Sequence, residues 1–280
     1  MKKIKSFSFQ GVNGAYSEQA GLKLFLDANS IPCPTFEDMF DKVRAGEVDA
    51  AMVPIENSLA GRVADTQRLI PESNLKITDE YFLEVNHNLI GIKGSTISDI
   101  KRIHSHEQGI AQCRKKIIKL KKEMIIEADT AGSAKMIAEL NNIHDAAIAS
   151  ELAAKIYDLE ILETNFQDSS NNVTRFLVMQ KDLVDVDPSS NQVLTTLVFT
   201  VRSIPSALYK CLGGFASNGV NITKLESYIH PQGFDVAQFY IDFEGHPDNS
   251  SVKLALDEMK FFCKHQKIVG VYKKANFRKK

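Results

Sequence analysis

Hydrophobic and polar positions follow two different periods along the first 181 residues. Short runs rich in β-branched and aromatic residues, such as Ile4 to Phe9 and Asp49 to Ile55, are typical of strands. Between these runs, apolar residues recur every three or four positions, most clearly from Ile110 to Leu120, which predicts helices. Strands that alternate with helices are the pattern of an α/β domain with a largely parallel sheet.

Further strands and two helix starts can be placed in the same way. Ser17 follows a glycine-bracketed turn and is a candidate N-cap, and Thr35 with Asp38 resembles a capping box in which Asp replaces the usual Glu. Gly46 then ends the second of these helices. The remaining strand candidates are Asn88 to Ile92, Lys101 to His104, Met124 to Ala128, Ala146 to Ser150 and Thr174 to Gln180.

The pattern changes after residue 181. Residues 182–192 combine acids, proline and serine without an apolar period, so we interpret them as a linker. The order beyond them is strand, helix, two strands joined by a turn at His230 to Gly233, helix and strand, which is the ferredoxin-like βαββαβ pattern. We therefore predict one domain over residues 1–181 and a second over residues 193–280.

Composition and charge narrow the class of protein. The 280 residues include 34 Lys and Arg against 35 Asp and Glu, and 44% are hydrophobic, as in soluble globular proteins of about two domains. A formal net charge of -1 disfavours nucleic-acid and polybasic membrane binders, and we interpret the six basic residues from Arg114 to Lys122 as a solvated helix face. We expect small-molecule partners instead.

Cysteines and the N-terminus bear on the redox compartment and the location. The four cysteines are far apart and form no CxxC or CxxH pattern, which predicts reduced, buried thiols and no zinc site. No signal peptide or membrane-spanning run is recognisable, so we expect a cytoplasmic protein.

Two clusters of polar side chains follow predicted strands. Glu56, Asn57 and Ser58 come directly after one strand, and Ser105 and Gln112 follow another. Because ligands gather at the carboxyl ends of strands in open α/β sheets, a substrate is expected here. The alternative is that Asn57 and Ser58 only cap the next helix. The histidines around Ser105 lack the HxxxH spacing of a metal site, and no turn has nucleotide-binding glycine spacing, so we predict neither a metal nor a cofactor.

The last strand of the first domain contains a third cluster, at Thr174, Arg175 and Phe176. Strand alternation places Thr174 and Phe176 on one face and Arg175 on the other, so the three line one site only if the strand is bulged or Arg175 reaches around its edge. A threonine without a base is a poor nucleophile. Chemistry alone leaves this cluster undecided.

Five segments in order resemble the successive motifs of the prephenate dehydratase family, and together they span the first domain. They are GVNGAYSEQA at 11–20, PIENSLAGRV at 54–63, HSHEQGIAQC at 104–113, DTAGSA at 129–134 and NVTRF at 172–176. The second domain resembles an ACT domain, with IPSAL at 204–208 near the family's GAL segment and LESY at 225–228 near its ESRP segment. Since the motifs begin by Gly11, we expect no chorismate mutase domain in front.

The resemblance implies a fold and a reaction. The fold is α/β, with a two-lobed catalytic domain like a type II periplasmic binding protein followed by a ferredoxin-like ACT domain. Lobe 1 would comprise residues 1–80 and 160–181 and lobe 2 residues 81–159, with crossover strands near 78–86 and 158–170. The cofactor-free reaction converts prephenate to phenylpyruvate, with loss of carbon dioxide and water, in L-phenylalanine biosynthesis.

Roles for single residues follow from the same resemblance. Thr174 is expected to assist departure of the ring hydroxyl, and the expected substrate-binding residues are Glu56, Asn57, Ser58, Ser105, Gln112, Arg175 and Phe176. Arg175 suits a carboxylate by its charge and fork geometry, although its alternation with Thr174 leaves that role open.

The ACT segment departs from the family at two places, because Ser206 replaces the usual Gly and Tyr228-Ile229 replaces Arg-Pro. We nevertheless expect feedback inhibition by phenylalanine in a homodimer or tetramer formed through the ACT and catalytic domains. The expected phenylalanine-binding residues are Ala207, Leu208, Asn221, Leu225, Glu226 and Ser227. Two alternatives are arogenate dehydratase and a non-catalytic cytosolic module that senses an amino acid or binds a solute.

Overall fold

The computed structural model describes residues 3–229 and 237–279, and they fall into two compact units. The first unit comprises Ile4–Val63 and Tyr81–Phe176, and the second comprises Lys3, Ala64–Glu80 and the described residues from Leu177 onward. The domain boundaries at 181 and 193 stay a prediction. Among the described residues, no helix is both long and apolar enough to cross a membrane.

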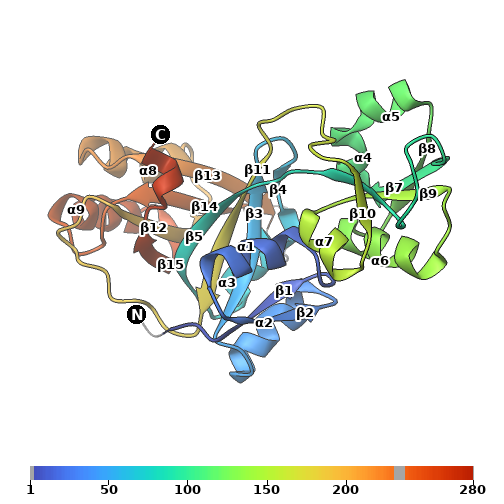
Figure 1. The fold of residues 1–280 in the computed structure, drawn as a ribbon. Coiled ribbons are helices and arrows are strands. Elements are labelled where there is room, and N and C mark those ends of the chain that lie inside the picture. The colour runs from blue at the N-terminus through green and yellow to red at the C-terminus, as the bar shows by residue number, and fades with distance from the viewer. Residues whose placement is uncertain (1–2, 230–236, 280) are drawn as a thin grey trace. The chain divides into compact units, whose positions relative to one another are not determined.

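Strands and helices alternate through the first unit, as expected of the α/β class (Figure 1). Its lobe 1 elements are β1 Ser6–Gln10, α1 Tyr16–Leu24, β2 Asn29–Cys33, α2 Phe36–Ala45, β3 Ala50–Asn57 and β4 Gly61–Arg62. Its lobe 2 elements are β6 Asn88–Gly91, β7 Arg102–His106, α4 Glu107–Gln112, α5 Arg114–Leu120, β8 Glu123–Glu127, α6 Thr130–Leu140, β9 Asp145–Ala149, α7 Glu151–Ile156 and β10 Glu160–Glu163. Two strands, β5 Lys76–Glu84 and β11 Val173–Gln180, contribute residues to both units.

Two separate sheets give the first unit its two lobes. In lobe 1, β1 lies between β2 and β3 and is parallel to both, and β4 pairs antiparallel with the end of β3. In lobe 2 the strand order is β10-β6-β9-β7-β8. Strand β5 leads the chain into lobe 2 and β11 brings it back beside β3, so the predicted two-lobed, periplasmic-binding-protein-like arrangement is confirmed. The return crossover expected near 158–170 is placed too early, because Glu160–Glu163 still pairs with β6 in the lobe 2 sheet.

Side-chain alternation explains why helices cover both faces of the lobe 2 sheet. Leu89 and Ile148 point to one face and pack with apolar residues of α4 and α5. Their neighbours Ile90 and Ala149 point to the other face and pack with α6 and α7. Figure 1 shows the two helix pairs on opposite sides of this sheet. The lobe is therefore a doubly covered α/β layer, which suits a near-continuous run of buried residues in each strand.

Capping residues set the helix starts, and one of the two predictions is wrong. Thr35 caps α2 as predicted, because its Oγ1 accepts from the Asp38 amide at 3.0 Å. Helix α1 instead begins at Tyr16, and Ser17 is not its cap. The buried Glu18 carboxylate accepts from the Gly14 amide at 2.5 Å, which satisfies a backbone donor before the first turn without a hydroxyl cap.

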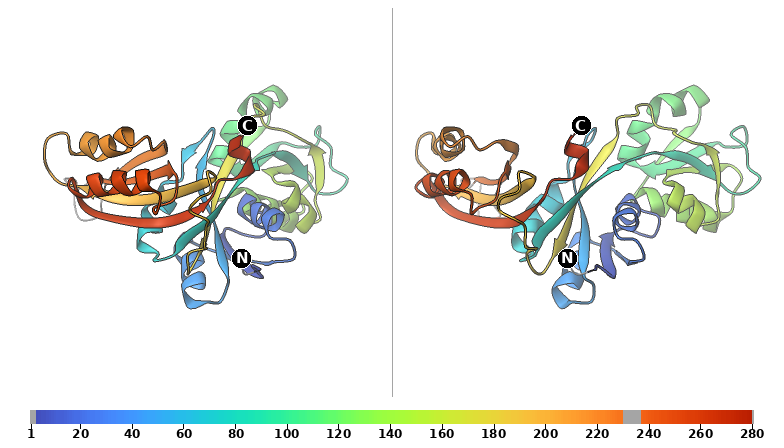
Figure 2. Two further views of the ribbon diagram at one scale, coloured as in Figure 1. Left: turned by 90° about the vertical axis from the view of Figure 1, so that its left-hand side faces the viewer. Right: turned by 60° about the vertical axis from the view of Figure 1, so that its left-hand side comes forward.

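The second unit contains the predicted βαββαβ order. Its elements are α3 Ala64–Glu72, β12 Val193–Val201, α8 Ala207–Ser217, β13 Ile222–Ile229, β14 Ala237–Glu244, α9 Ser250–Lys260, β15 Cys263–Lys273 and the 3₁₀ turn η1 Asn276–Lys279. The predicted turn at 230–233 lies outside the described residues. Figure 2 shows α8 and α9 on the same face of this unit's sheet.

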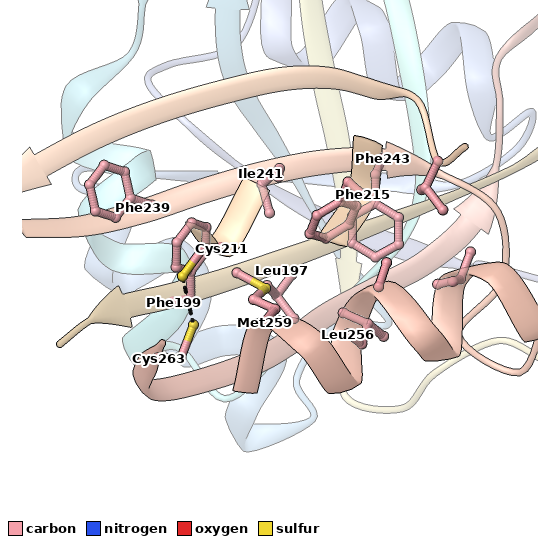
Figure 3. Packing of buried hydrophobic residues seen from close by; sticks show 13 residues of the cluster. Leu197, Phe199, Cys211, Phe215, Phe239, Ile241, Phe243, Leu256, Met259 and Cys263 are labelled. Carbon is pink, nitrogen blue, oxygen red and sulfur yellow. Dashed lines mark hydrogen bonds between the residues drawn. The ribbon is translucent and has the colours of Figure 1, made fainter. Parts of the chain in front are cut away.

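Aromatic residues from alternate positions of β12 and β14 form the core beneath these two helices. Phe199, Phe239 and Phe243 point inward with Phe215 of α8 and Met259 of α9 (Figure 3). The Phe215 and Phe243 rings lie 5.0 Å apart between centroids, a favourable tilted pair. All four cysteines of the chain are free and buried, as predicted.

A glycine permits β15 to pair with β5 inside the second unit. Gly270 lies opposite Ile77, and a Cβ on Gly270 would stand 2.5 Å from the Ile77 Cβ and 2.8 Å from its carbonyl oxygen. Since backbone atoms cannot yield as a flexible side chain does, only glycine fits this position.

We expect Gly270→Ala to lower the free energy of unfolding by about 1–3 kcal/mol through this overpacking. Gly213→Ala, in α8 of the same unit, is the matched control, because no described atom lies within 4 Å of its added Cβ. Alanine's higher helix propensity should make this control more stable by up to about 1 kcal/mol. Urea unfolding of both variants measures the difference, and equal changes would contradict the close approach.

Candidate active site

Asn57, the last residue of β3, has its side-chain orientation fixed by the backbone. Its Oδ1 accepts from the amides of Leu59 and Ala60, both at 2.9 Å. Backbone N–H groups only donate, so the atom that faces them is the oxygen and the amide cannot be reversed. Asn57 therefore caps a turn, and the alternative that it caps the next helix is wrong, because α3 begins only at Ala64.

The NH₂ group of Asn57 then faces β11. Its Nδ2 donates to the Asn172 Oδ1 at 2.7 Å and to the Thr174 Oγ1 at 2.9 Å. Thr174 is half-buried, and its own hydroxyl hydrogen has no acceptor among residues 3–229 and 237–279. The site thus holds a threonine whose oxygen accepts from the protein and whose hydrogen is available to a bound molecule.

A second chain of hydrogen bonds continues from Asn172 into lobe 2. The Asn172 Nδ2 donates to the Gln112 Oε1 at 2.8 Å, and the His87 Nε2 lies 2.7 Å from the same oxygen. The other ring nitrogen of His87, Nδ1, is 2.8 Å from the Tyr16 hydroxyl. Gln112 ends α4, His87 precedes β6 and Tyr16 begins α1, so the network joins both lobes of the first unit.

Burial keeps the two ring-bearing members of the network uncharged at neutral pH. It lowers the pKa of His87, which the hydrogen bond to Gln112 only partly offsets. It also raises the pKa of Tyr16 well above its usual value, and the neighbouring Cys113 adds to the rise. An uncharged His87 has one donor nitrogen and one acceptor nitrogen.

Arg175 and Glu56 form a separate pair on the same two strands. The Arg175 Nη1 donates to the Glu56 Oε1 at 3.0 Å, and the Arg175 side chain is 1% exposed. Because consecutive residues of a strand point to opposite faces, this pair lies on the face opposite to Asn57 and Thr174. The predicted alternation of Arg175 with Thr174 is thus maintained in β11.

The other predicted substrate-binding residues have structural contacts of their own. The Ser58 Oγ donates to the Asn171 carbonyl at 2.6 Å, which holds the turn after β3 against β11. Ser105 is buried and donates to the Ile148 carbonyl at 2.8 Å, and Phe176 is 1% exposed. Substrate binding by Glu56, Ser58, Ser105, Arg175 and Phe176 stays a prediction.

Hydrogen bonds bring together three of the predicted residues, Asn57, Gln112 and Thr174, and join them to three that were not predicted, namely Tyr16, His87 and Asn172. Tyr16 and Asn172 lie inside motifs quoted for the resemblance, whereas nothing in the pattern marks His87. Within the described part of the chain, no group of three or more His, Cys, Asp or Glu side chains is arranged to hold a metal ion.

Comparison with known proteins gives consistent matches. The family model described as prephenate dehydratase matches residues 7–183. A curated protein of Komagataeibacter europaeus, a bifunctional N-acyl-homoserine lactone acylase/prephenate dehydratase, is 44% identical over 273 residues, which cover 98% of this chain and 97% of that protein. The chloroplastic arogenate dehydratase/prephenate dehydratase 2 of Arabidopsis thaliana is 39% identical over 279 residues, which cover 95% of this chain and 72% of that protein.

A solved structure extends the match to the whole fold. The prephenate dehydratase of Arthrobacter aurescens, in complex with L-Phe, superposes with a TM-score of 0.87 at 32% identity. The match covers 97% of this chain and 90% of that one, and so includes both the two-lobed part and the βαββαβ part.

Proposed function

Because this chain belongs to the prephenate dehydratase family and is thus a lyase, we propose that it converts prephenate to phenylpyruvate in L-phenylalanine biosynthesis. The observation that carries the proposal is the hydrogen bond from the Asn57 Nδ2 to the Thr174 Oγ1. It leaves the Thr174 hydroxyl hydrogen available for donation to a leaving hydroxyl. A cytoplasmic location and a homo-oligomer are part of the same proposal.

The reaction makes two demands on the site. The bond between the ring and its carboxylate breaks, and its electron pair enters the ring. The C–O bond to the hydroxyl breaks at the ring carbon para to the carboxylate. Carbon dioxide leaves, and the departing hydroxide takes a proton to become water. Aromatisation drives the reaction, so the protein needs chiefly to bind the dianion and to stabilise the oxygen that departs.

Thr174 meets the second demand as a hydrogen-bond donor. A threonine hydroxyl is too weak an acid to protonate hydroxide fully in advance, so it donates while the C–O bond lengthens, and solvent restores the proton. The hydrogen bond that Thr174 accepts from Asn57 polarises its O–H bond, since donors and acceptors in a chain strengthen one another.

Two substrates are compatible with the proposal, because relatives named for arogenate and for prephenate both match the chain. The test is to incubate the purified chain separately with prephenate and with arogenate and to follow the aromatic product by absorbance, with a no-enzyme control. We expect saturable consumption of prephenate. Consumption of arogenate alone would correct the substrate, and consumption of neither would refute the proposal.

We further propose that phenylalanine inhibits the enzyme through the βαββαβ part. A 680 Å³ pocket there is lined by the loop from Val201 to Tyr209 with Ala237 and Lys264, and so includes Ala207 and Leu208. Ser206 adopts φ 60°, the left-handed conformation that glycine takes freely, so the replacement preserves the backbone of the loop. The other expected contacts, Asn221, Leu225, Glu226 and Ser227, stay a prediction.

Phenylalanine up to millimolar concentration should lower turnover and raise the melting temperature of the chain by mass action. Tyrosine and leucine at equal concentration serve as specificity controls. An unchanged rate together with an unchanged melting temperature would remove phenylalanine as the regulator without affecting the proposed reaction.

The name of the Komagataeibacter relative favours one second candidate, hydrolysis of an N-acyl-homoserine lactone to a fatty acid and homoserine lactone. The same purified chain is to be assayed with such a lactone and with prephenate. Release of free homoserine lactone above the no-enzyme rate would support this second activity, and no release would exclude it for the lactone tested.

A further inference from the structure

We propose that Tyr16 and His87 are positioning residues that hold the Gln112 amide with its NH₂ group toward the substrate. This inference rests on the proposed function, because it concerns how the dianion is bound. It follows from the order of donors and acceptors along the hydrogen bonds from Asn57 to Tyr16. Once the orientation of the Asn57 amide is known, the donor and the acceptor of each following hydrogen bond are determined.

The first choice is made by the backbone. The amides of Leu59 and Ala60 require an oxygen at the Asn57 Oδ1, so the Asn57 Nδ2 donates to the Asn172 Oδ1. The remaining end of Asn172 must then be its NH₂ group, and it donates to Gln112 at 2.8 Å. The Gln112 atom that receives this bond is therefore the oxygen Oε1.

The histidine continues the same order. The Gln112 Oε1 can only accept, so the His87 Nε2, 2.7 Å away, bears the hydrogen. An uncharged His87 then has a bare Nδ1, which accepts from the Tyr16 hydroxyl at 2.8 Å. Tyr16 also lies 3.1 Å from the Asn86 carbonyl, but donation there would require a second hydrogen on His87 and thus a cation inside a buried site.

The consequence lies at the free end of Gln112. With Oε1 held by His87 and Asn172, the NH₂ group of the half-buried Gln112 has no acceptor in the described part of the chain. It presents two hydrogens to the site, where a dianion would accept them. A reversed amide would direct its carbonyl at the same dianion and its NH₂ group at the Asn172 NH₂ group and the His87 Nε2–H. The Nε2–H form of His87, held by Tyr16, therefore acts together with Asn172 to keep the NH₂ group of Gln112 toward the substrate.

The pair positions and does not conduct protons. Carboxamides separate His87 from Thr174 at Gln112, Asn172 and Asn57, and a carboxamide does not pass a proton along as a hydroxyl or water does. His87 is thus expected to influence how tightly the substrate binds, leaving the departure of the hydroxyl to Thr174.

Nitrogen-15 NMR of histidine-labelled protein tests the tautomer without any substrate. At neutral pH, we expect His87 to have its hydrogen on Nε2, and Tyr16→Phe to shift its population toward the Nδ1–H form. Tyr157→Phe is the control, because that tyrosine donates to the Asn13 carbonyl at 2.8 Å, outside the network. An Nδ1–H form or a cation in the unsubstituted protein would overturn the inference.

Steady-state kinetics with prephenate test the consequence for binding. A glutamine side chain reaches as far as the His87 Nε2 and an asparagine only as far as Nδ1. His87→Gln should therefore keep KM within about threefold, whereas His87→Asn should raise KM about tenfold with kcat within about threefold, as for a lost hydrogen bond to a charged group. His144→Gln is the control, since the His144 ring makes its hydrogen bond to the Asp99 carbonyl at 2.8 Å, outside the network.

The outcomes separate this inference from the proposed function. An unsubstituted chain that consumes no prephenate and no arogenate overturns both. An active chain in which His87→Gln and His87→Asn have equal KM values, or in which both variants only lower the melting temperature, overturns the positioning role alone. The role is supported by the split between the two variants at similar melting temperatures.

Discussion

A Thr174→Val variant should turn over prephenate about a thousandfold more slowly than the unsubstituted chain at saturating substrate, within the range for a lost general acid. Valine has the shape of threonine, so the replacement exchanges the hydroxyl for a methyl group and leaves the packing of β11 intact. Asn57 loses one acceptor but keeps Asn172. The expected loss is therefore in kcat, with KM and the melting temperature little changed.

Thr78→Val is the matched control for this variant. The Thr78 hydroxyl lies in β5 and donates to the Val178 carbonyl at 3.3 Å, outside the Asn57 network. We expect its turnover within about twofold of the unsubstituted chain. If the turnover of Thr174→Val falls no further than that of Thr78→Val, the hydroxyl at position 174 is dispensable.

Asn57→Asp should lower kcat about a hundredfold. The carboxylate still accepts from the amides of Leu59 and Ala60, but its second oxygen now faces Asn172 and Thr174, where the NH₂ group donated. That oxygen captures the Thr174 hydroxyl hydrogen, which is then lost to the leaving group. It also adds a negative charge to a site proposed to bind a dianion, and like charges repel.

Charge and hydrogen-bond direction can be separated with Asn171→Asp. Asn171 is exposed, lies beside the network and undergoes the same change of charge. We expect Asn171→Asp to lower kcat less than Asn57→Asp does and mainly to raise KM. Added salt should reduce this rise, because exposed charges are screened. Equal losses in kcat for Asn57→Asp and Asn171→Asp would mean that charge alone explains the result and that the Asn57 donor is unimportant.

Strands with strong apolar patterns, and the polar residues that follow them, could be predicted from the sequence. The end of β3 at Asn57 and the start of β11 at Val173 lie within two residues of their predicted places. Strand β2 was missed because its sequence, NSIPC, is short, polar and interrupted by Pro32. It forms only because the backbone of β1 supplies a parallel partner from Ser6 to Gln10.

The hydrogen bonds that join the site residues into a network had no comparable signal. His87 and Gln112 are 25 positions apart, and Asn57 and Thr174 are 117 positions apart, so no local period relates them. Single polar residues in loops and at helix ends acquire meaning only when folding brings their donors and acceptors together. Ser17 is the opposite case, a local signal that the fold does not use. Its hydroxyl suits a helix cap, but the Glu18 carboxylate already accepts from the backbone before the first turn of α1.

The most direct test of the account is the turnover of prephenate by Thr174→Ser measured beside Thr174→Val. Serine retains the hydroxyl that Asn57 orients and loses only a methyl group. We predict that Thr174→Ser keeps at least about a tenth of the unsubstituted kcat, while Thr174→Val falls by about a thousandfold. Equal turnover by the two variants would contradict the claim that this hydroxyl assists the departure of water.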